Sequence, residues 1–227
     1  MRDLKPVVQV ALDIVEIEQA IEIAKLAVKG GVEWVEAGTP LIKAAGLEVV
    51  RQLRRAFPDK TIVADMKTMD VGALEVELAA KAGADVVCVL GAAADATISE
   101  AVKAARKCNV KVLVDLLAVH DLRARATQVE KLGADYLGVH VGIDQQKLGI
   151  DPIEQLQAIV GSVRIPIAVA GGITVKTAPE LVRRGASIII VGSAITKAKD
   201  VTRAAREVVA AIRTSASRAG FSQHKAH

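Results

Sequence analysis

Aromatic residues and cysteines are scarce in this chain of 227 residues, which has one Trp, one Tyr, two Phe and two Cys. So few aromatic rings leave little material for the base-stacking surfaces of single-strand nucleic-acid binders. The net charge of +4 is also too small for a basic surface that follows a phosphate backbone. We therefore expect no nucleic-acid partner. Cys88 and Cys108 lack the spacing of metal ligands, so we expect neither a zinc site nor a disulfide.

Long uncharged apolar runs are also missing, although 52% of the residues are hydrophobic. No run reaches the roughly 18 residues that a membrane-spanning helix needs. The first residues lead directly into a Val-rich segment and do not have the pattern of a signal peptide. The sequence therefore predicts a cytoplasmic protein without a membrane partner, long enough for one sizeable core.

Short runs of β-branched residues alternate with stretches of helical spacing, in eight units. The predicted strands lie near 7–12, 33–37, 61–66, 85–90, 111–116, 135–140, 165–170 and 187–191. The predicted helices lie near 16–29, 45–56, 71–82, 95–107, 121–132, 152–160, 174–184 and 200–213. Strands that are apolar on both faces and alternate with helices indicate a parallel sheet covered by helices, and eight units indicate a closed (β/α)8 TIM barrel.

A doubly wound open sheet is the competing architecture. It normally has a glycine-rich phosphate turn after the first strand, where this chain has Leu12-Asp13-Ile14-Val15. We expect one barrel domain over residues 1–213, followed by a flexible C-terminal tail over 214–227 that is rich in Ser, Ala, Lys and His. Gly83, Gly133 and Gly185 each follow a predicted helix and are expected to cap helix ends on the far side of the barrel.

Charged side chains stand at the carboxyl ends of five of the predicted strands. They are Asp13, Glu36, Asp65 and Lys67 with Asp70 just beyond, Asp115, and His140. The active sites of TIM barrels lie at this rim, so these side chains are expected to converge there. Any one of them could be a salt bridge or a helix cap, but burying the whole set unpaired would cost several kcal/mol for each group. The set therefore predicts a catalytic site.

The residue types suggest different roles in that site. Glu36 and Asp65, on adjacent strands, supply the oxygen ligands that Mg²⁺ prefers. Lys67 stands beside Asp65 and Asp70, and these two carboxylates would keep its ammonium group protonated against developing negative charge. His140 has a side chain suited to moving a proton near neutral pH, although a hydrogen-bonded core histidine is the alternative.

Glycine-containing pairs end the seventh and eighth predicted strands. They are Gly171-Gly172 and Gly192-Ser193. The usual phosphate site of a TIM barrel is formed after these two strands by backbone N–H groups and a helix N-terminus. Tight turns also need glycine, but two pairs at the two expected strands favour a phosphorylated substrate.

These strand ends resemble the orotidine-monophosphate-decarboxylase suprafamily. The matching strings are Val10-Ala11-Leu12-Asp13, Glu36-Ala37-Gly38-Thr39-Pro40, Ala64-Asp65-Met66-Lys67-Thr68-Met69-Asp70, Val114-Asp115-Leu116, Val139-His140-Val141-Gly142-Ile143-Asp144 and Ala170-Gly171-Gly172-Ile173. The Asp-x-Lys-x-x-Asp pattern is the suprafamily's signature when it ends a third barrel strand. The resemblance runs from the first strand to the seventh and implies a TIM-barrel enzyme that acts on a phosphorylated substrate.

Two positions distinguish the branches of the suprafamily. The nucleotide decarboxylases have a lysine and no metal at the end of strand two, where Glu36 stands here, so that activity is disfavoured. The 3-keto-L-gulonate-6-phosphate decarboxylases have an arginine three residues after the strand-six histidine, where Ile143 stands here. The resemblance therefore favours the aldolase branch, which uses Mg²⁺ and an enediolate to join formaldehyde to D-ribulose 5-phosphate, giving D-arabino-3-hexulose 6-phosphate.

Further roles follow from this resemblance. His140 would move the proton, Lys67 would neutralise the enediolate, and Asp13 and Asp115 would orient hydroxyl groups of the ketose. Asp70 would reach the active site of a partner subunit, which implies a homodimer. The keto-gulonate decarboxylase remains the alternative enzyme, and a non-catalytic phosphosugar-binding barrel is the alternative of another class.

Overall fold

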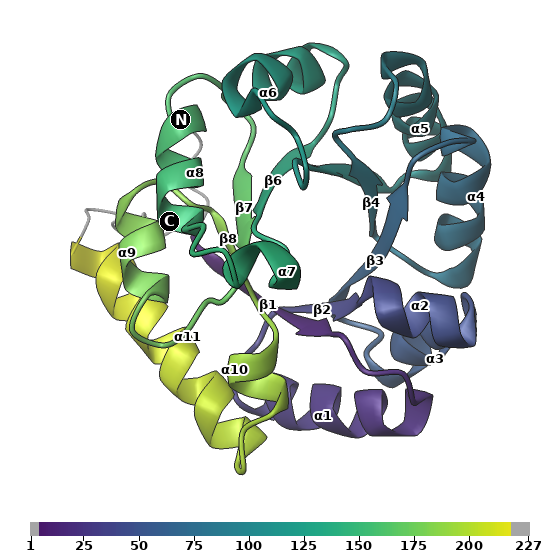
Figure 1. Cartoon of the computed structure of the whole chain (residues 1–227). Coiled ribbons are helices and arrows are strands. Elements are labelled where there is room, and N and C mark those ends of the chain that lie inside the picture. Colours follow the sequence, from purple (N-terminus) through teal and green to yellow (C-terminus); the bar gives the residue numbers. More distant parts are fainter. Residues whose placement is uncertain (1–4, 219–227) are drawn as a thin grey trace, which may run out of the picture.

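Eight parallel strands close into a barrel in chain order in the computed structural model, which describes residues 5–218 (Figure 1). The strands are β1 Val7–Leu12, β2 Trp34–Ala37, β3 Thr61–Thr68, β4 Val86–Leu90, β5 Lys111–Asp115, β6 Tyr136–His140, β7 Ile167–Ala170 and β8 Ile188–Val191. Pairing of β1 with β8, with Val10 opposite Val191, closes the ring. The predicted (β/α)8 TIM barrel is therefore confirmed.

Most of the helices form a ring around the strands (Figure 1). The helices are α1 Ile17–Lys29, α2 Thr39–Ala45, α3 Glu48–Ala56, α4 Gly72–Ala82, α5 Asp95–Cys108, α6 Leu122–Lys131, α7 Ile143–Gln146, α8 Pro152–Ile159, α9 Ala178–Arg183, α10 Ser193–Thr196 and α11 Val201–Arg218. The main core lies between this ring and the strands, where Val, Leu, Ile and Ala side chains are buried. In the described part of the chain, no helix has both the length and the apolar character needed to cross a bilayer.

A second group of apolar side chains fills the inside of the barrel. It includes Val63, Cys88, Leu113 and Ala168, which come from four different strands. Trp34 on β2 and Tyr136 on β6 meet edge to face, with ring centroids 5.5 Å apart. Since β2 and β6 lie on opposite sides of the ring, this contact crosses the interior. The barrel is therefore packed with side chains below its mouth.

A repeated clamp ties pairs of strands together at the amino-terminal face. Asp85, just before β4, donates its N–H to Ile62 O, and its carboxylate accepts the Ile62 N–H at 2.7 Å. Asp135, just before β6, makes the same exchange with Val112, at 3.0 and 2.9 Å. Arg54 and Arg106 bind these two carboxylates from neighbouring helices. We call this two-way exchange the carboxylate clamp.

The preceding strand pair has the same clamp, in which Glu33 takes the place of the aspartate. Its N–H is 3.1 Å from Val8 O, and its carboxylate accepts the Val8 N–H at 3.0 Å. The predicted cap glycines have positive φ, 103° at Gly83, 93° at Gly133 and 102° at Gly185. These values agree with their predicted position at helix ends.

Several helices differ from the sequence prediction. The short helices α7 and α10 were not expected, and α9 begins at Ala178 instead of near 174. The helix expected over 45–56 is α3, which begins at Glu48, and α2 over Thr39–Ala45 was not predicted; Gly46, with a φ of 65°, separates the two helices. The flexible tail expected from residue 214 was placed too early, because α11 continues to Arg218. In that extension Ser215 is buried and donates its hydroxyl to Pro179 O at 3.0 Å. The rest of the expected tail, 219–227, lies outside the described residues.

Candidate active site

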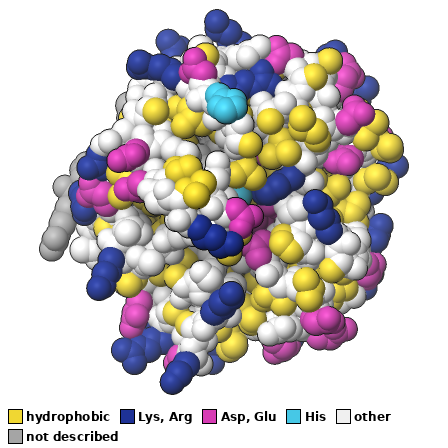
Figure 2. Space-filling model, viewed as in Figure 1, with side chains coloured by type: hydrophobic (Ala, Val, Ile, Leu, Met, Phe, Trp, Pro, Cys, Tyr) yellow, Lys and Arg dark blue, Asp and Glu magenta, His cyan; other side chains and the backbone are white. Residues whose placement is uncertain are grey.

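The predicted site residues lie at or just after the carboxyl ends of strands, at one end of the barrel. In Figure 2, viewed as in Figure 1, acidic and basic side chains adjoin one another near the middle of this face. Glu36, Asp65 and Asp115 are buried there, at 6%, 7% and 5% exposed. Burial of three carboxylates in one place is costly without partners, so their contacts define the chemistry of the site.

Asp115, at the end of β5, contacts both a lysine and a histidine through one carboxylate oxygen. Its Oδ2 lies 3.2 Å from Lys67 Nζ and 2.8 Å from His140 Nδ1. Its Oδ1 accepts the Leu117 N–H at 2.9 Å. Burial by itself would raise the pKa of Asp115, but the hydrogen bond and charge of His140, together with Lys67, hold it below its ordinary value. Asp115 is therefore a carboxylate that orients two neighbours.

His140 ends β6 with its imidazole partly open to solvent, at 24% exposed. If Nδ1 carries the proton and donates it to Asp115, Nε2 keeps its lone pair. This tautomer makes Nε2 the atom that can accept a proton from a bound substrate.

Lys67 bridges two carboxylates at the end of β3. Its Nζ lies 2.7 Å from Asp65 Oδ2 as well as 3.2 Å from Asp115 Oδ2. Burial would lower the pKa of Lys67, but these two carboxylates outweigh it and raise the pKa, so the ammonium group stays charged. The backbone at Lys67 has a φ of 46°, and the β3–β4 register is interrupted between Ala64 and Thr68. The local irregularity lies at the residue that carries the charge, as is common at functional sites.

Asp65 and Glu36 form an acidic pair suited to a divalent cation. Asp65 Oδ2 accepts from Lys67, whereas Asp65 Oδ1 is buried and has no hydrogen-bond partner among the described residues. Burial, followed by the charges of Asp65 and Asp13, raises the pKa of Glu36 well above its ordinary value. A cation would satisfy the orphaned oxygen and relieve this repulsion, so the pair fits Mg²⁺, which proteins often bind with one or two carboxylates. Within residues 5–218 no group of three or more His, Cys, Asp or Glu side chains is arranged to hold a metal.

Two polar residues that were not predicted as site residues contact this pair. Gln9, inside β1, donates its side-chain N–H to Glu36 Oε2. Thr39, at the start of α2, has its hydroxyl 2.8 Å from both the backbone oxygen and Oδ2 of Asp65. The available signals were a lone glutamine in an apolar strand and a threonine in the Gly-Thr-Pro string after Glu36 and Ala37.

Asp13 follows β1 and lies against the backbone of the next strand end. A Cβ at Gly38 would lie 2.3 Å from Asp13 Oδ1, so only glycine fits beside it. Burial and then the charge of Asp65 raise the pKa of Asp13. Asp13 therefore belongs electrostatically to the acidic group around Glu36 and Asp65.

Asp70 lies apart from these contacts. It is exposed on the turn into α4, and its Oδ1 accepts the N–H of Val71 at 2.7 Å. The expectation that Asp65 and Asp70 flank Lys67 was therefore half right, because the second carboxylate partner of Lys67 is Asp115. Sequence neighbours suggested Asp70, whereas Asp115 reaches Lys67 from β5, two strands away in the ring.

The two glycine-containing pairs lie at the ends of the adjacent strands β7 and β8, as predicted. Gly171 has a φ of 113°, and a Cβ there would lie 2.4 Å from Val141 O. The N–H groups of Gly171, Gly172, Gly192 and Ser193 donate to no other described residue. These free donors suit an anion at the mouth of the barrel.

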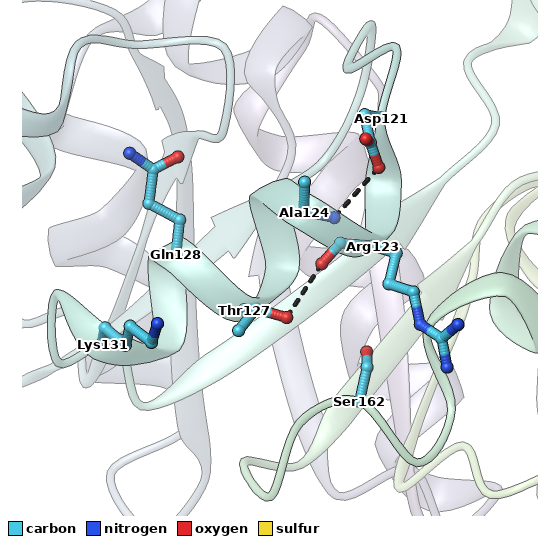
Figure 3. A pocket seen from close by; sticks show the side chains of 7 residues that line it. All are labelled: Asp121, Arg123, Ala124, Thr127, Gln128, Lys131 and Ser162. Atoms are coloured by element: carbon cyan, nitrogen blue, oxygen red, sulfur yellow. Dashed lines mark hydrogen bonds between the residues drawn. The ribbon is translucent and has the colours of Figure 1, made fainter.

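Neither of two hollows in the surface contains the charged cluster. One of about 490 Å³ lies on the outside of the barrel against α6, lined by Arg123, Gln128, Lys131 and Ser162 among others (Figure 3). Another of about 270 Å³ is bounded by Gly171 and Gly172 and by the segment after α7. The second one adjoins Gly171 and Gly172 of the predicted phosphate site.

A closed barrel whose strand ends bring together carboxylates, a charged lysine and a histidine has the architecture of a (β/α)8 enzyme. The chain belongs to the orotidine 5'-phosphate decarboxylase / HUMPS family, which matches residues 6–208. The predicted suprafamily and the prediction of an enzyme are thereby confirmed.

Individual relatives cover nearly the whole chain. A protein of Mycobacterium gastri named 3-hexulose-6-phosphate synthase is 47% identical over 205 residues, which are 90% of this chain and 98% of that protein. A crystal structure of 3-hexulose-6-phosphate synthase has a TM-score of 0.85 and 45% identity, covering 90% of this chain and 98% of the other. The structure of 3-keto-L-gulonate-6-phosphate decarboxylase from Vibrio cholerae has a TM-score of 0.82 at 28% identity, covering 92% and 98%.

Proposed function

We propose that this chain is a magnesium-dependent aldolase, a 3-hexulose-6-phosphate synthase, which joins formaldehyde to D-ribulose 5-phosphate. The likeness to proteins of that name over 90% of the chain carries the proposal. The contacts among Asp65, Lys67, Asp115 and His140 support it, because they place a charged ammonium group and a basic imidazole at the mouth of one barrel.

His140 is the proposed acid–base group. Its Nε2 removes the proton from C1 of the ketose, and the C1–H electron pair forms the C1–C2 double bond of an enediolate. C1 then attacks the carbon of formaldehyde, and the formaldehyde oxygen takes the proton back from His140. The product is D-arabino-3-hexulose 6-phosphate, with no atom gained or lost. Asp115 keeps the imidazole in the tautomer that this cycle needs.

Lys67 is the proposed group that neutralises the enediolate. Two carboxylates hold its ammonium group in place and charged before substrate arrives, so little reorganisation is needed during the reaction. Glu36 and Asp65 are the proposed ligands of Mg²⁺. When bound, Mg²⁺ supplies Lewis-acid polarisation of the ketose carbonyl.

The remaining predicted residues have proposed roles in substrate binding. Gly171, Gly172, Gly192 and Ser193 offer N–H donors to the phosphate. Asp13 orients a hydroxyl group of the ketose. Asp115 was expected to do the same, but both of its carboxylate oxygens already have protein partners, so we assign it to positioning.

The test is formaldehyde consumption by purified protein supplied with D-ribulose 5-phosphate, with added Mg²⁺ or with EDTA. A parallel assay measures CO₂ release from 3-keto-L-gulonate 6-phosphate. We expect fast, magnesium-dependent loss of formaldehyde and little CO₂. If CO₂ release dominated, the protein would instead be a 3-keto-L-gulonate-6-phosphate decarboxylase. Ile143 argues against that outcome, because this exposed apolar side chain follows His140 by three residues, where an arginine was expected in a decarboxylase.

We also propose a homodimer in which Asp70 reaches the partner's active site. Exposed apolar side chains lie close to Asp70 in the chain, with Met69 and Val71 each 55% exposed and Leu74 54% exposed. Figure 2 shows hydrophobic side chains gathered on the side of the molecule near α4. Exposed apolar side chains gathered on one side favour association with another chain.

Mixing two inactive variants tests the homodimer directly. Asp70→Asn and His140→Ala subunits, each inactive alone, should regain about a quarter of the wild-type activity after mixing. Half of the dimers formed contain one subunit of each kind, and each of these mixed dimers has one complete active site out of two. A mixture that stays inactive although light scattering shows dimers would contradict a shared site.

A further inference from the structure

Gln9 is a polar side chain in the packed interior of the barrel that no step of the proposed reaction uses. It is 0% exposed and lies in the middle of the apolar run of β1. Its side-chain N–H donates to Glu36 Oε2, whereas its own Oε1 is buried and has no hydrogen-bond partner among residues 5–218. Burying an unsatisfied amide oxygen lowers stability, so an apolar residue would suit packing better here. A polar residue in such a place needs an explanation.

The register explains how Gln9 reaches Glu36. Gln9 is opposite Trp34 and Ala11 is opposite Glu36 on the adjacent strand β2, so Gln9 lies one step deeper in the barrel than the carboxylate. Its amide therefore approaches Glu36 from the interior side. Glu36 Oε2 is held by this hydrogen bond, and Glu36 Oε1 makes no hydrogen bond within the described part of the chain.

Asp65 shows the same division between its two oxygens. Oδ2 is held by Lys67 and Thr39, at 2.7 and 2.8 Å, and Oδ1 is left without a partner. Each carboxylate of the acidic pair thus has one oxygen fixed by a neighbouring side chain and one left open. This is the arrangement expected of metal ligands whose orientation is set by a second layer of hydrogen bonds.

We propose that Gln9 is a positioning residue for the divalent-cation site, and that it fixes the Glu36 carboxylate so that its free oxygen faces the cation. This inference rests on the magnesium site of the proposed function. The competing explanation is that Gln9 only fills space in the barrel. The two differ in their consequence for metal affinity, because loss of an outer hydrogen bond to a ligand lowers affinity by about 10- to 100-fold, whereas loss of a filler does not.

The experiment measures Mg²⁺ binding by calorimetry, and Mn²⁺ binding by the decrease of the free-ion paramagnetic resonance signal, without substrate. The variants are Gln9→Met, which keeps the length of the side chain and removes its hydrogen-bonding atoms, and Gln9→Leu in case the first does not fold. Leu113→Met is the matched control, since Leu113 is 2% exposed in the same interior and has no hydrogen bond to lose. Glu36→Gln reports the loss of a proposed ligand.

We expect the Gln9 variants to melt cooperatively in EDTA and to bind both ions about 10- to 100-fold more weakly than wild type, with Leu113→Met unchanged. Equal affinity of wild type and a folded Gln9 variant would overturn the positioning role and leave the proposed function standing. Absence of Mg²⁺ and Mn²⁺ binding by wild type would overturn both. Equal weakening by Leu113→Met would also overturn the proposal, because interior packing alone would then account for the effect.

Discussion

Replacement of Asp115 by Asn tests the contacts on which the proposed chemistry depends. The Leu117 N–H, 2.9 Å from Oδ1, needs an acceptor, so the new amide oxygen should take that position. Its NH₂ group would then face Lys67 Nζ and His140 Nδ1, both of which now donate to Asp115. To avoid two donors meeting, His140 must turn Nδ1 into an acceptor and carry its proton on Nε2. The imidazole then has no lone pair available for the substrate.

The expected magnitude follows from this change of tautomer. Replacing the aspartate behind a catalytic histidine by asparagine lowers kcat by about 10⁴-fold in a serine protease. For Asp115→Asn we expect a fall in kcat of about 10³- to 10⁴-fold, or about 4 to 5.5 kcal/mol of transition-state stabilisation. KM should change little. Lys67 keeps its 2.7 Å contact with Asp65, so Mg²⁺ affinity should also remain near that of wild type.

The assay is steady-state formaldehyde consumption, with Asp135→Asn as the matched control. Asp135 is a carboxylate of the same type in the clamp at the opposite face, where it accepts from Val112 and Arg106. The Asp135→Asn control should have a lower unfolding free energy than wild type and an unchanged kcat. A kcat for Asp115→Asn within tenfold of wild type would refute the reasoning that Asp115 sets the tautomer of His140.

The same variant has an expected dependence of stability on pH. The pKa of Asp115 is lowered in the folded protein, so its contribution is present above the ordinary value of 3.8 and is lost as the pH falls through the folded-state pKa. The difference in unfolding free energy between wild type and Asp115→Asn should therefore shrink on acidification. Urea denaturation at a series of pH values measures it, and a difference that grows toward low pH would contradict the assigned direction.

Three other perturbations have definite expected results. Burial raises the pKa of Glu36. Without metal, the contribution of Glu36 to the unfolding free energy is therefore lost as the pH rises through its folded-state pKa, and the increase in Tm on adding Mg²⁺ should be larger at about pH 8 than at about pH 5. Equal increases in Tm at the two pH values would contradict this. Gly171→Ala places a Cβ 2.4 Å from Val141 O at a φ of 113°, so it should lower the unfolding free energy by about 1–3 kcal/mol and raise KM for D-ribulose 5-phosphate; denaturation and kinetics that match wild type would argue against it. Arg54→Met removes hydrogen bonds to Gly83 O and Asp85, and should lower the unfolding free energy by about 1–3 kcal/mol without changing kcat; a changed kcat would show that the two ends of the barrel are coupled.

The architecture and the strand ends were predictable from the sequence because their signals are local. A polar residue directly after an apolar strand, as at Glu36 or His140, indicates the rim of a barrel, and this signal can be recognised without knowing which distant residues it contacts. The helix α2 was missed because its seven residues are too few to show a helical period, and only the Thr39-Pro40 start indicates it.

The contacts within the site were not predictable, because they join residues far apart in the chain. Asp115 is 48 positions from Lys67 and 25 from His140, and no local pattern indicates that one carboxylate oxygen serves both. Gln9 was missed for a related reason, since its partner Glu36 lies on the next strand, 27 positions away. Asp70, by contrast, was predicted as a partner of Lys67 because it is close in the sequence, although the fold places it on an exposed turn.

The carboxylate clamp occurs at every second strand, so the repeating unit of the barrel is a pair of strands. It joins β1 to β2, β3 to β4 and β5 to β6, and in the fourth pair the backbone half alone remains, from Ser187 N–H to Ile167 O at 2.8 Å. A clamp that repeats every two strands is expected if the barrel arose by duplication of a two-strand unit. It also indicates where the molecule can be divided: new termini placed between the pairs, for example after β2 or β4, leave every clamp within one segment, whereas a cut inside a pair separates its two halves.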